Sequence, residues 1–402
     1  MQKGIFLLLF LSSLLGFSQG RDSIHLKNGI ENPSLLATHH FGIFSSRINP
    51  NFKIRPPKKS TLEISYTSGN IFQPFVEAHL PKDPQIRKAL SNVVWFDRQF
   101  NFIDQQTTPA DYMNIVVDAV IKEFRVNYTT RLTRNSELGI TLRSYLITDG
   151  SYPFSFFASD ESIEWFHSNI AGGEDPFGRR YYGLNQVNFK YTDRNGGVLE
   201  LKENDFFIGG IETNYFYYPK LFKDDNLHTN FGVHLGVNTS KFNPSIDIGV
   251  SANTIKEWTL NNRDEFRFAL GINLLHKNSI NFDEVIELGN NRFLGTFEPQ
   301  IEYTKYTRKK NYHSFSAHYQ LQTRFRKKEE ESYYRLLGKW QEINAGWHNG
   351  ISTMYKNLTA WTFLYSYGTP KYKLSLFLKE DLLVHNAPDV QTGISLKIPI
   401  SN

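Results

Sequence analysis

The sequence predicts an all-β fold: an antiparallel, up-and-down transmembrane β-barrel of about fourteen strands, with twelve as the main alternative. Three observations lead to this prediction. Apolar and polar side chains alternate in many segments from about residue 123 to the C-terminus, an export signal stands at the N-terminus, and no apolar run of roughly 20 residues follows that signal. Because only helices and closed barrels satisfy every backbone polar group in lipid, a mature chain that spans a membrane must use strands.

Residues 1–20 have the features of a secretory signal peptide. Lys3 supplies a positive charge, an apolar stretch runs to Phe17, and the small residues Ser18 and Gly20 stand three and one before a cleavage site after Gly20. A retained membrane anchor is the alternative, but the apolar run is short for one. The chain has no cysteine, so no lipid can be attached to that residue and no disulfide is expected after export. The predicted location is the bacterial outer membrane.

Two regions follow the signal. Residues 21–60 show no strand pattern and carry the pairs His39–His40 and Pro56–Pro57, so we expect a periplasmic N-terminal extension there. Residues 61–402 form the predicted barrel domain, and its first strand begins the alternation at Leu62.

Two long connections, near 73–112 and 149–183, interrupt the strands of the predicted barrel. Shorter connections such as Asn135–Ser136 and Asn349–Gly350 are typical of hairpin turns, which join antiparallel strands. Single-chain bacterial barrels have an even number of strands. Consecutive strands run in opposite directions, so both long connections fall at the same end of the barrel, which we take as the outer side. The predicted strands lie at about 62–67, 113–133, 137–148, 184–193, 197–217, 228–238, 245–256, 263–276, 291–306, 312–325, 332–347, 351–367, 371–381 and 389–399.

The segment from Glu123 to Leu132 shows the alternation clearly, with apolar side chains such as Phe124 at most even positions and polar ones at the odd positions. Successive side chains of a strand point to opposite faces, so the even positions are expected to face lipid and the odd positions the lumen. The same argument, applied to the other well-patterned strands, assigns these charged residues to the lumen: Glu123, Arg125, Arg131, Arg143, Glu265, Arg267, Lys373 and Lys397.

Aromatic residues at strand ends favour a membrane barrel over a soluble β-sandwich, the alternative that would also alternate. Tyrosine and tryptophan are enriched where a barrel meets the two membrane–water interfaces. The residues in question are Tyr215, Tyr217, Tyr218, Tyr333, Tyr334, Trp361, Tyr365 and Tyr367. They predict outer-membrane lipid as a partner of the chain.

The segment DESIEWFHSNI, residues 160–170, is expected to form a short helix in the second long connection. Ser159 or Asp160 would cap this helix, and Gly172–Gly173 would end it. His167 and a nearby carboxylate could act as an acid–base pair. The simpler interpretation is an amphipathic helix that rests on the rim of the barrel.

Residues 160–183 also resemble a segment of an uncharacterised bacterial family, domain of unknown function 3187. Its members tend to carry a Phe–His pair, a glycine-rich stretch and an arginine before the next strand, which Phe166, His167 and Arg179 match as candidate motif residues. Glu380–Asp381, followed by Pro388–Asp389–Val390, is similar to the family's C-terminal strand pair. The resemblance implies an envelope barrel and brings no activity or catalytic residues with it.

Signatures of enzymes and of nucleic-acid-binding proteins are absent from the sequence. It contains no HExxH, GxSxG, CxxC or GxxxxGK[ST] motif. His313–Ser314 superficially suggests the Ser–His pair of an outer-membrane phospholipase, but neighbours in a strand point in opposite directions. No cofactor and no metal site is predicted, since no carboxylate stands at a ligand spacing from His39–His40. The net charge of +5 is not concentrated in a block that could follow a phosphate backbone, so no nucleic-acid partner is expected.

The favoured function is a monomeric outer-membrane barrel that passes or binds a small solute, placed in the membrane by the outer-membrane insertion machinery. The lumen-facing residues are more often basic than acidic, which predicts a mild anion preference if the lumen is open. An interior filled with salt-bridged side chains is the alternative and would suit a plugged structural or assembly component of the envelope. A lipid-modifying enzyme at the barrel rim, dependent on His167, is a second alternative.

Overall fold

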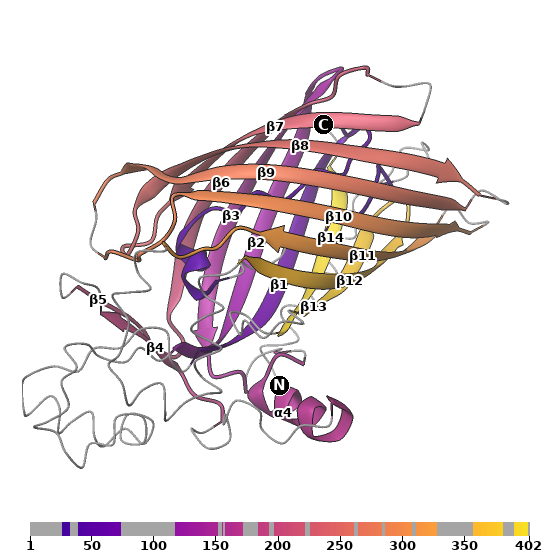
Figure 1. Cartoon of the computed structure of the whole chain (residues 1–402). Helices are drawn as coiled ribbons and strands as arrows, with labels where there is room; N and C mark the ends of the chain where they lie inside the picture. The colour runs from indigo at the N-terminus through magenta and orange to yellow at the C-terminus, as the bar shows by residue number, and fades with distance from the viewer. Residues whose placement is uncertain are drawn as a thin grey trace, which may run out of the picture.

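A computed structural model describes residues 26–32, 39–73, 117–151, 155, 157–171, 184–192, 197–221, 226–260, 264–283, 286–307, 311–327, 357–380 and 390–400. In this part of the chain twelve antiparallel strands close into a barrel, and a hairpin of two more strands stands at one end (Figure 1). The strands are β1 (Ser60–Gln73), β2 (Val117–Thr133), β3 (Ser136–Thr148), β4 (Asn188–Thr192), β5 (Val198–Leu201), β6 (Phe206–Tyr217), β7 (Leu227–Asn238), β8 (Ser245–Thr259), β9 (Glu265–Asn281), β10 (Phe293–Tyr306), β11 (Tyr312–Gln322), β12 (Leu358–Gly368), β13 (Lys373–Glu380) and β14 (Val390–Ile400).

The pairing of the strands shows how the barrel closes. Strands that follow one another in the ring pair antiparallel, and β3 pairs with β6 because the β4–β5 hairpin lies outside the ring. β1 completes the closure by pairing with both β14 and β2, with Ser60 opposite Ile400 and Leu62 opposite Tyr128. Of the fourteen strands described, twelve make the barrel, so the alternative count of twelve is right for the ring itself.

One predicted strand is divided in the structure. The predicted strand 197–217 divides into β5 and β6, because a polar turn intervenes in which Asn204 has a φ of 68°. Asparagine accepts this left-handed conformation more readily than most residues, so the turn forms without a glycine. The predicted strand 332–347 lies outside the described residues.

The two ends of the barrel differ in their connections. The loop end carries helix α4, the β4–β5 hairpin and the departure points of both long connections, after β1 and after β3 (Figure 1). The opposite end, which we call the short-turn end, is where β1 begins and β14 ends. Its connections between strands are 134–135, 218–226, 260–264, 307–311 and 369–372.

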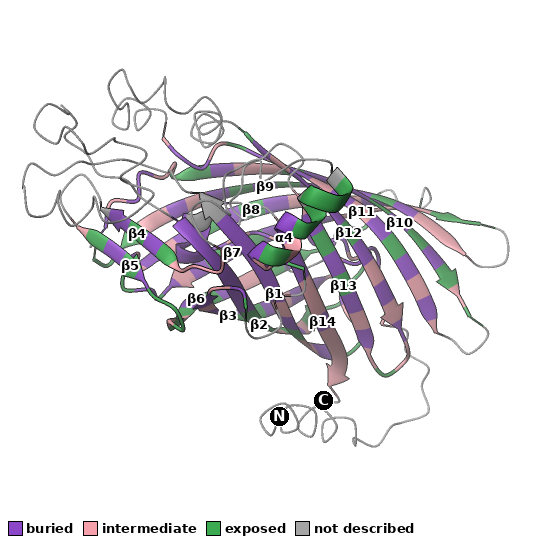
Figure 2. Ribbon diagram, turned by 90° about the horizontal axis from the view of Figure 1, so that it is seen from below, coloured by how far each residue is buried: buried purple, intermediate pink, exposed green. Residues whose placement is uncertain are grey.

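The barrel is apolar outside and polar inside. On β2, Phe124 has 40% of its surface exposed, whereas the neighbouring Glu123 and Arg125 are 1% and 4% exposed. Figure 2 shows the same alternation as bands of buried and exposed residues along the strands. The distribution is the reverse of that in a water-soluble protein and suits a barrel surrounded by lipid, with its polar side chains inside.

Helix α4 (Asp160–Phe166) and a π-helical turn (His167–Ala171) form the short helix expected in the second long connection. The Ser159 hydroxyl caps the helix by accepting a hydrogen bond from the Ser162 backbone N–H. Asp160 ties it to the barrel, since one carboxylate oxygen accepts a hydrogen bond of 2.7 Å from the Asn70 side chain on β1. No helix among the described residues is long and apolar enough to cross a membrane.

The N-terminal segment lies inside the barrel, and this corrects the expectation of an extension outside it. We call residues 26–32 and 39–54 the plug; they include a 3-10 helix (His40–Phe44), seen in indigo within the ring of strands in Figure 1. Inward-facing side chains of the wall bind the plug backbone: Asp247 accepts from the Ser46 N–H at 2.7 Å, and Gln300 donates to the Glu31 carbonyl at 2.7 Å. The wall thus supplies the hydrogen bonds that a segment with little regular secondary structure needs when it is buried.

An apolar cluster closes the loop end of the lumen. Phe41, Ile43 and Phe44 of the plug pack there against side chains of the β4–β5 hairpin, including Phe189 and Tyr191. Tyr191 lies 4.9 Å from Phe41 between ring centroids, a distance typical of packed aromatic pairs. Burying each large apolar side chain contributes about 1.5–3 kcal/mol, so this end of the plug is held mainly by the hydrophobic effect.

Candidate functional site inside the barrel

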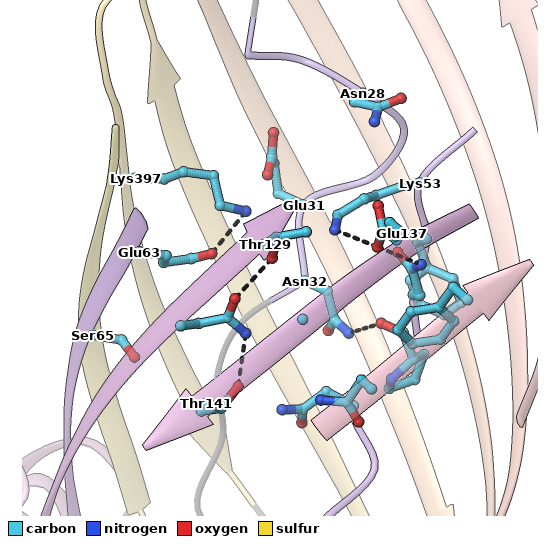
Figure 3. A pocket seen from close by; sticks show the side chains of 18 of the residues that line it. Asn28, Glu31, Asn32, Lys53, Glu63, Ser65, Thr129, Glu137, Thr141 and Lys397 are labelled. Carbon is cyan, nitrogen blue, oxygen red and sulfur yellow. Dashed lines mark hydrogen bonds and ion pairs between the residues drawn. The ribbon is translucent and has the colours of Figure 1, made fainter. Parts of the chain in front are cut away.

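A polar cavity lies between the plug and the wall in the half of the lumen near the short-turn end (Figure 3). Water molecules could fill about 160 Å³ of it, and a single water needs about 10–15 Å³ on this measure. The cavity therefore has room for several waters or for a small polar solute. Its charged lining residues are Arg47, Lys53, Arg125, Lys373 and Lys397 on the basic side and Glu31, Glu63, Glu137 and Glu212 on the acidic side.

The first group of ion pairs joins the plug to β10 and β13. Glu31 pairs with Lys373 of β13, and Lys27 pairs with Glu302 of β10. Tyr312 of β11 donates a further hydrogen bond of 3.0 Å to Glu31. Burial by itself raises the pKa of the Glu31 carboxyl, but the positive charges of Lys373 and Lys27 outweigh it and hold that pKa well below its ordinary value.

A second group centres on Glu212 of β6. Its carboxylate pairs with Arg125 of β2, with the Nε atom of Arg143 of β3 at 3.0 Å, and with the backbone N–H of Arg47 in the plug at 3.2 Å. Arg143 also donates to the Ser45 carbonyl of the plug at 2.7 Å. One carboxylate and two arginines therefore connect three wall strands with the plug, in the way that guanidinium groups bind several acceptors at once.

A third group lies nearest the short-turn end, where β3 begins. Lys53 of the plug forms an ion pair of 2.7 Å with Glu137, and the Asn51 side chain donates to the same carboxylate at 3.1 Å. Asn51 also donates to the Tyr218 hydroxyl at 2.7 Å. Figure 3 shows Lys53 and Glu137 on one side of the cavity and the pair of Lys397 with Glu63, at 2.7 Å, on the other.

The predicted lumen residues lie on β2, β3, β9, β13 and β14. Glu123, Arg125, Arg143, Arg267 and Lys373 are buried inside the barrel. Glu265 and Lys397 are partly buried and paired, Glu265 with Arg267 and Lys397 with Glu63. Arg131 differs: its side chain is exposed near the β2–β3 turn, where its Nε donates to the Thr133 carbonyl at 2.8 Å. Arg131 occupies an odd-numbered position of β2, as Glu123 and Arg125 do. It lies too close to the end of the strand, however, to contribute to the interior.

The loop-motif residues do not form a site among the described residues. Phe166 is exposed on α4, His167 begins the π-helical turn, and Arg179 lies outside the described residues. His313 and Ser314 point in opposite directions, as their strand position predicts. His313 is within 2.9 Å of the Tyr365 hydroxyl, whereas Ser314 is buried 3.2 Å from Thr304. No group of three or more His, Asp or Glu side chains that could hold a metal ion occurs in the described part of the chain.

The plug residues of this site could not be recognised from the sequence. The sequence predicts an extension outside the barrel for the segment that carries Lys27, Glu31 and Lys53. No periodicity marks this segment, because its regular structure is limited to one short 3-10 helix. Glu137 and Glu212 of the wall are also absent from the predicted lumen residues. A usable signal was the surplus of predicted basic lumen residues, because charges buried in a lumen need partners.

Comparison with known proteins gives distant structural similarity only. No protein-family model and no curated protein matches the chain. Among solved structures, an outer membrane channel from Pseudomonas putida F1 is 8% identical with a TM-score of 0.40 and covers 88% of this chain and 100% of its own. LpxR from Salmonella typhimurium is 8% identical with a TM-score of 0.38 and covers 85% of this chain and 100% of its own. These similarities are too distant to carry an argument about function, and the resemblance to domain of unknown function 3187 stays a prediction.

Proposed function

We propose that the protein is a bacterial outer-membrane barrel that binds or passes a small polar solute, with its own plug as the gate of the lumen. The short-turn end would face the periplasm and the loop end the exterior, the usual orientation of such barrels. The observation that carries the proposal is the contact between plug and wall in the short-turn half. It consists of hydrogen bonds and ion pairs around a polar cavity.

The size of the ring supports a removable plug. An eight-stranded barrel is filled by its own side chains, whereas 16–18 strands leave an aqueous channel. Twelve strands lie between these limits, and here a separate segment occupies part of the interior. The wall behind that segment is polar. If the plug moved, water could therefore form the hydrogen bonds that the wall now makes with the plug. A plug held by apolar packing along its whole length would lack this property.

A disulfide between plug and wall tests the gate. A β-carbon added at Gly271 of β9 would lie 2.9 Å from the Pro50 β-carbon, and disulfides join β-carbons about 3.5–4.5 Å apart. The variant Pro50→Cys/Gly271→Cys therefore needs only a small shift to cross-link. The natural chain has no cysteine, so this disulfide would be the single one present. The measurement is uptake of small sugars and amino acids by liposomes that contain the purified protein.

We expect the oxidised variant to take up solute several-fold more slowly than the reduced variant, with reductant restoring the rate. The two single-cysteine variants serve as controls, because oxidation should leave their rates unchanged. Equal uptake by the locked and unlocked protein, or no uptake by any form, would contradict the gate. That result would favour the alternative of a permanently plugged structural or assembly component.

A further inference from the structure

A second cavity, of about 140 Å³, opens at the short-turn end below the first. Six of its lining residues are basic and none is acidic: Lys27, Lys53, Arg55, Lys58, Lys59 and Lys397. Lys53 and Lys397, which Figure 3 shows at the inner cavity, line both cavities, so the two spaces adjoin. The basic cavity therefore lies beside the inner cavity, at the short-turn end of the barrel.

The six basic residues divide into two sets. Lys27, Lys53 and Lys397 are paired with carboxylates, those of Glu302, Glu137 and Glu63, respectively. The second set, which we call the mouth triad, consists of Arg55, Lys58 and Lys59. Their side chains are exposed, and within the described part of the chain none of them forms an ion pair. Three positive charges therefore line one cavity at the rim, and no carboxylate of the described residues is paired with them.

The backbone that carries the mouth triad is fixed at both ends. The Asn28 side chain donates to the Arg55 carbonyl at 2.7 Å, and Ser60 begins the strand pairing of β1 with β14. Between these points Pro56 and Pro57 restrict φ at two successive residues. Such restriction lowers the entropy lost when a ligand binds, so the three charges are positioned in advance.

We propose that the mouth triad binds a phosphate group, either on a small solute or on a lipid headgroup at the membrane surface. Arginine offers two parallel N–H donors to phosphate oxygens, and lysines add positive charge. A phosphate with two negative charges suits three neighbouring cations better than a neutral solute does. The inference does not depend on movement of the plug, because the cavity is open in the structure as it stands.

The test measures the heat of binding of pyrophosphate and of inorganic phosphate to the purified full-length protein in a non-ionic detergent. The test variant is Arg55→Gln/Lys58→Gln/Lys59→Gln. The control variant, Arg134→Gln/Lys220→Gln/Lys371→Gln, removes one arginine and two lysines from exposed turns at the same end of the barrel. Both variants lose the same net charge, and all six side chains are exposed, so folding should be unaffected; heat-modifiable migration on a gel checks this.

We expect the affinities of the wild type and the control variant for pyrophosphate to agree within about twofold. The mouth-triad variant should bind at least about tenfold more weakly, and added salt should weaken the binding by every protein. A second arm asks whether phosphatidylglycerol stays bound to each protein in native mass spectrometry, with phosphatidylcholine for comparison. Retention of phosphatidylglycerol that requires the mouth triad, without binding of free phosphates, would identify a lipid as the source. Equal behaviour of the two variants in both arms, or no binding in either arm, would overturn the proposal.

Discussion

Glu31 in the plug forms an ion pair with Lys373 on β13, a residue 342 positions further along the chain. The pair joins the two ends of the sequence inside the barrel, where Lys27 and Tyr312 complete the surroundings of the carboxylate. A buried ion pair adds little stability compared with apolar packing, but removing one partner leaves the other charge uncompensated. The contact therefore fixes where the plug sits, and its loss should release this part of the plug.

Substitution of Glu31 tests that role directly. Glu31→Gln leaves Lys373 buried without its carboxylate, and breaking a buried pair in this way costs about 3–5 kcal/mol. We expect faster protease cleavage within the plug and a lower denaturant midpoint, measured in detergent. Glu200→Gln is the control, because Glu200 is exposed on the β4–β5 hairpin and should change the midpoint little. Equal protease sensitivity of the two variants would show that Glu31 does not anchor the plug.

The pH dependence of plug attachment follows from the same carboxyl. Its pKa in the folded protein lies below its ordinary value, because the attraction of Lys373 and Lys27 outweighs the effect of burial. The resulting stability is complete above the unfolded pKa, about 4.3 for glutamate, and is lost as the pH falls from there towards the folded pKa. The denaturant midpoint of the wild type should therefore fall more between pH 5 and pH 3 than that of Glu31→Gln. Parallel curves for the two proteins would assign the acid sensitivity to other carboxylates.

The faces of the wall strands could be predicted from the sequence, whereas the content of the lumen could not. Arg125 and Phe124 follow from the two-residue period alone, since a barrel wall has only two sides. Arg131 shows the limit of this prediction. Alternation tells which face of a strand a side chain is on, but not how far along the barrel it lies. The plug could not be found because its position depends on contacts with wall residues such as Glu212 and Asp247, far away in the sequence. Local patterns do not encode contacts of that kind.

Gly236 on β7 keeps room for the plug. A β-carbon at this position would lie 1.7 Å from the Ser46 hydroxyl oxygen and 2.6 Å from the Ser46 β-carbon, closer than atoms can approach. Gly236→Ala should therefore push the plug away from β7 at a cost of about 1–3 kcal/mol, the range for overpacking. Protease cleavage in the plug and solute uptake by liposomes should both increase. Gly295→Ala on β10 is the matched control, since its nearest contact would be an ordinary 3.5 Å.

A compensating change makes the prediction for Gly236 specific. Ser46→Gly removes the side chain that the new methyl group would meet, so Gly236→Ala/Ser46→Gly should recover most of the lost stability. If the double variant is no more stable than Gly236→Ala, the effect comes from the strand itself and not from the plug.

Helix α4 has one face that packs on the protein and one face that is exposed. Ile163 is 3% exposed and Trp165 is 58% exposed, two positions further along the same short helix. Ile163→Ala should lower the free energy of unfolding by about 2–5 kcal/mol through loss of packing, if the region unfolds together with the barrel. Trp165→Ala should change that free energy by less than about 0.5 kcal/mol in detergent.

The same tryptophan gives a test of what the exposed side of α4 meets. Phe166 and Ile170 are also exposed there, and apolar side chains at a barrel rim are suited to the membrane interface. In a variant that keeps Trp165 as the single tryptophan, fluorescence should be quenched by brominated lipids in liposomes. A variant that keeps only Trp258 on β8 is the positive control, because that side chain lies on the outer face of the barrel. Quenching of Trp258 without quenching of Trp165 would place the helix in water, above the rim, and would remove lipid contact as the reason for its exposed apolar side.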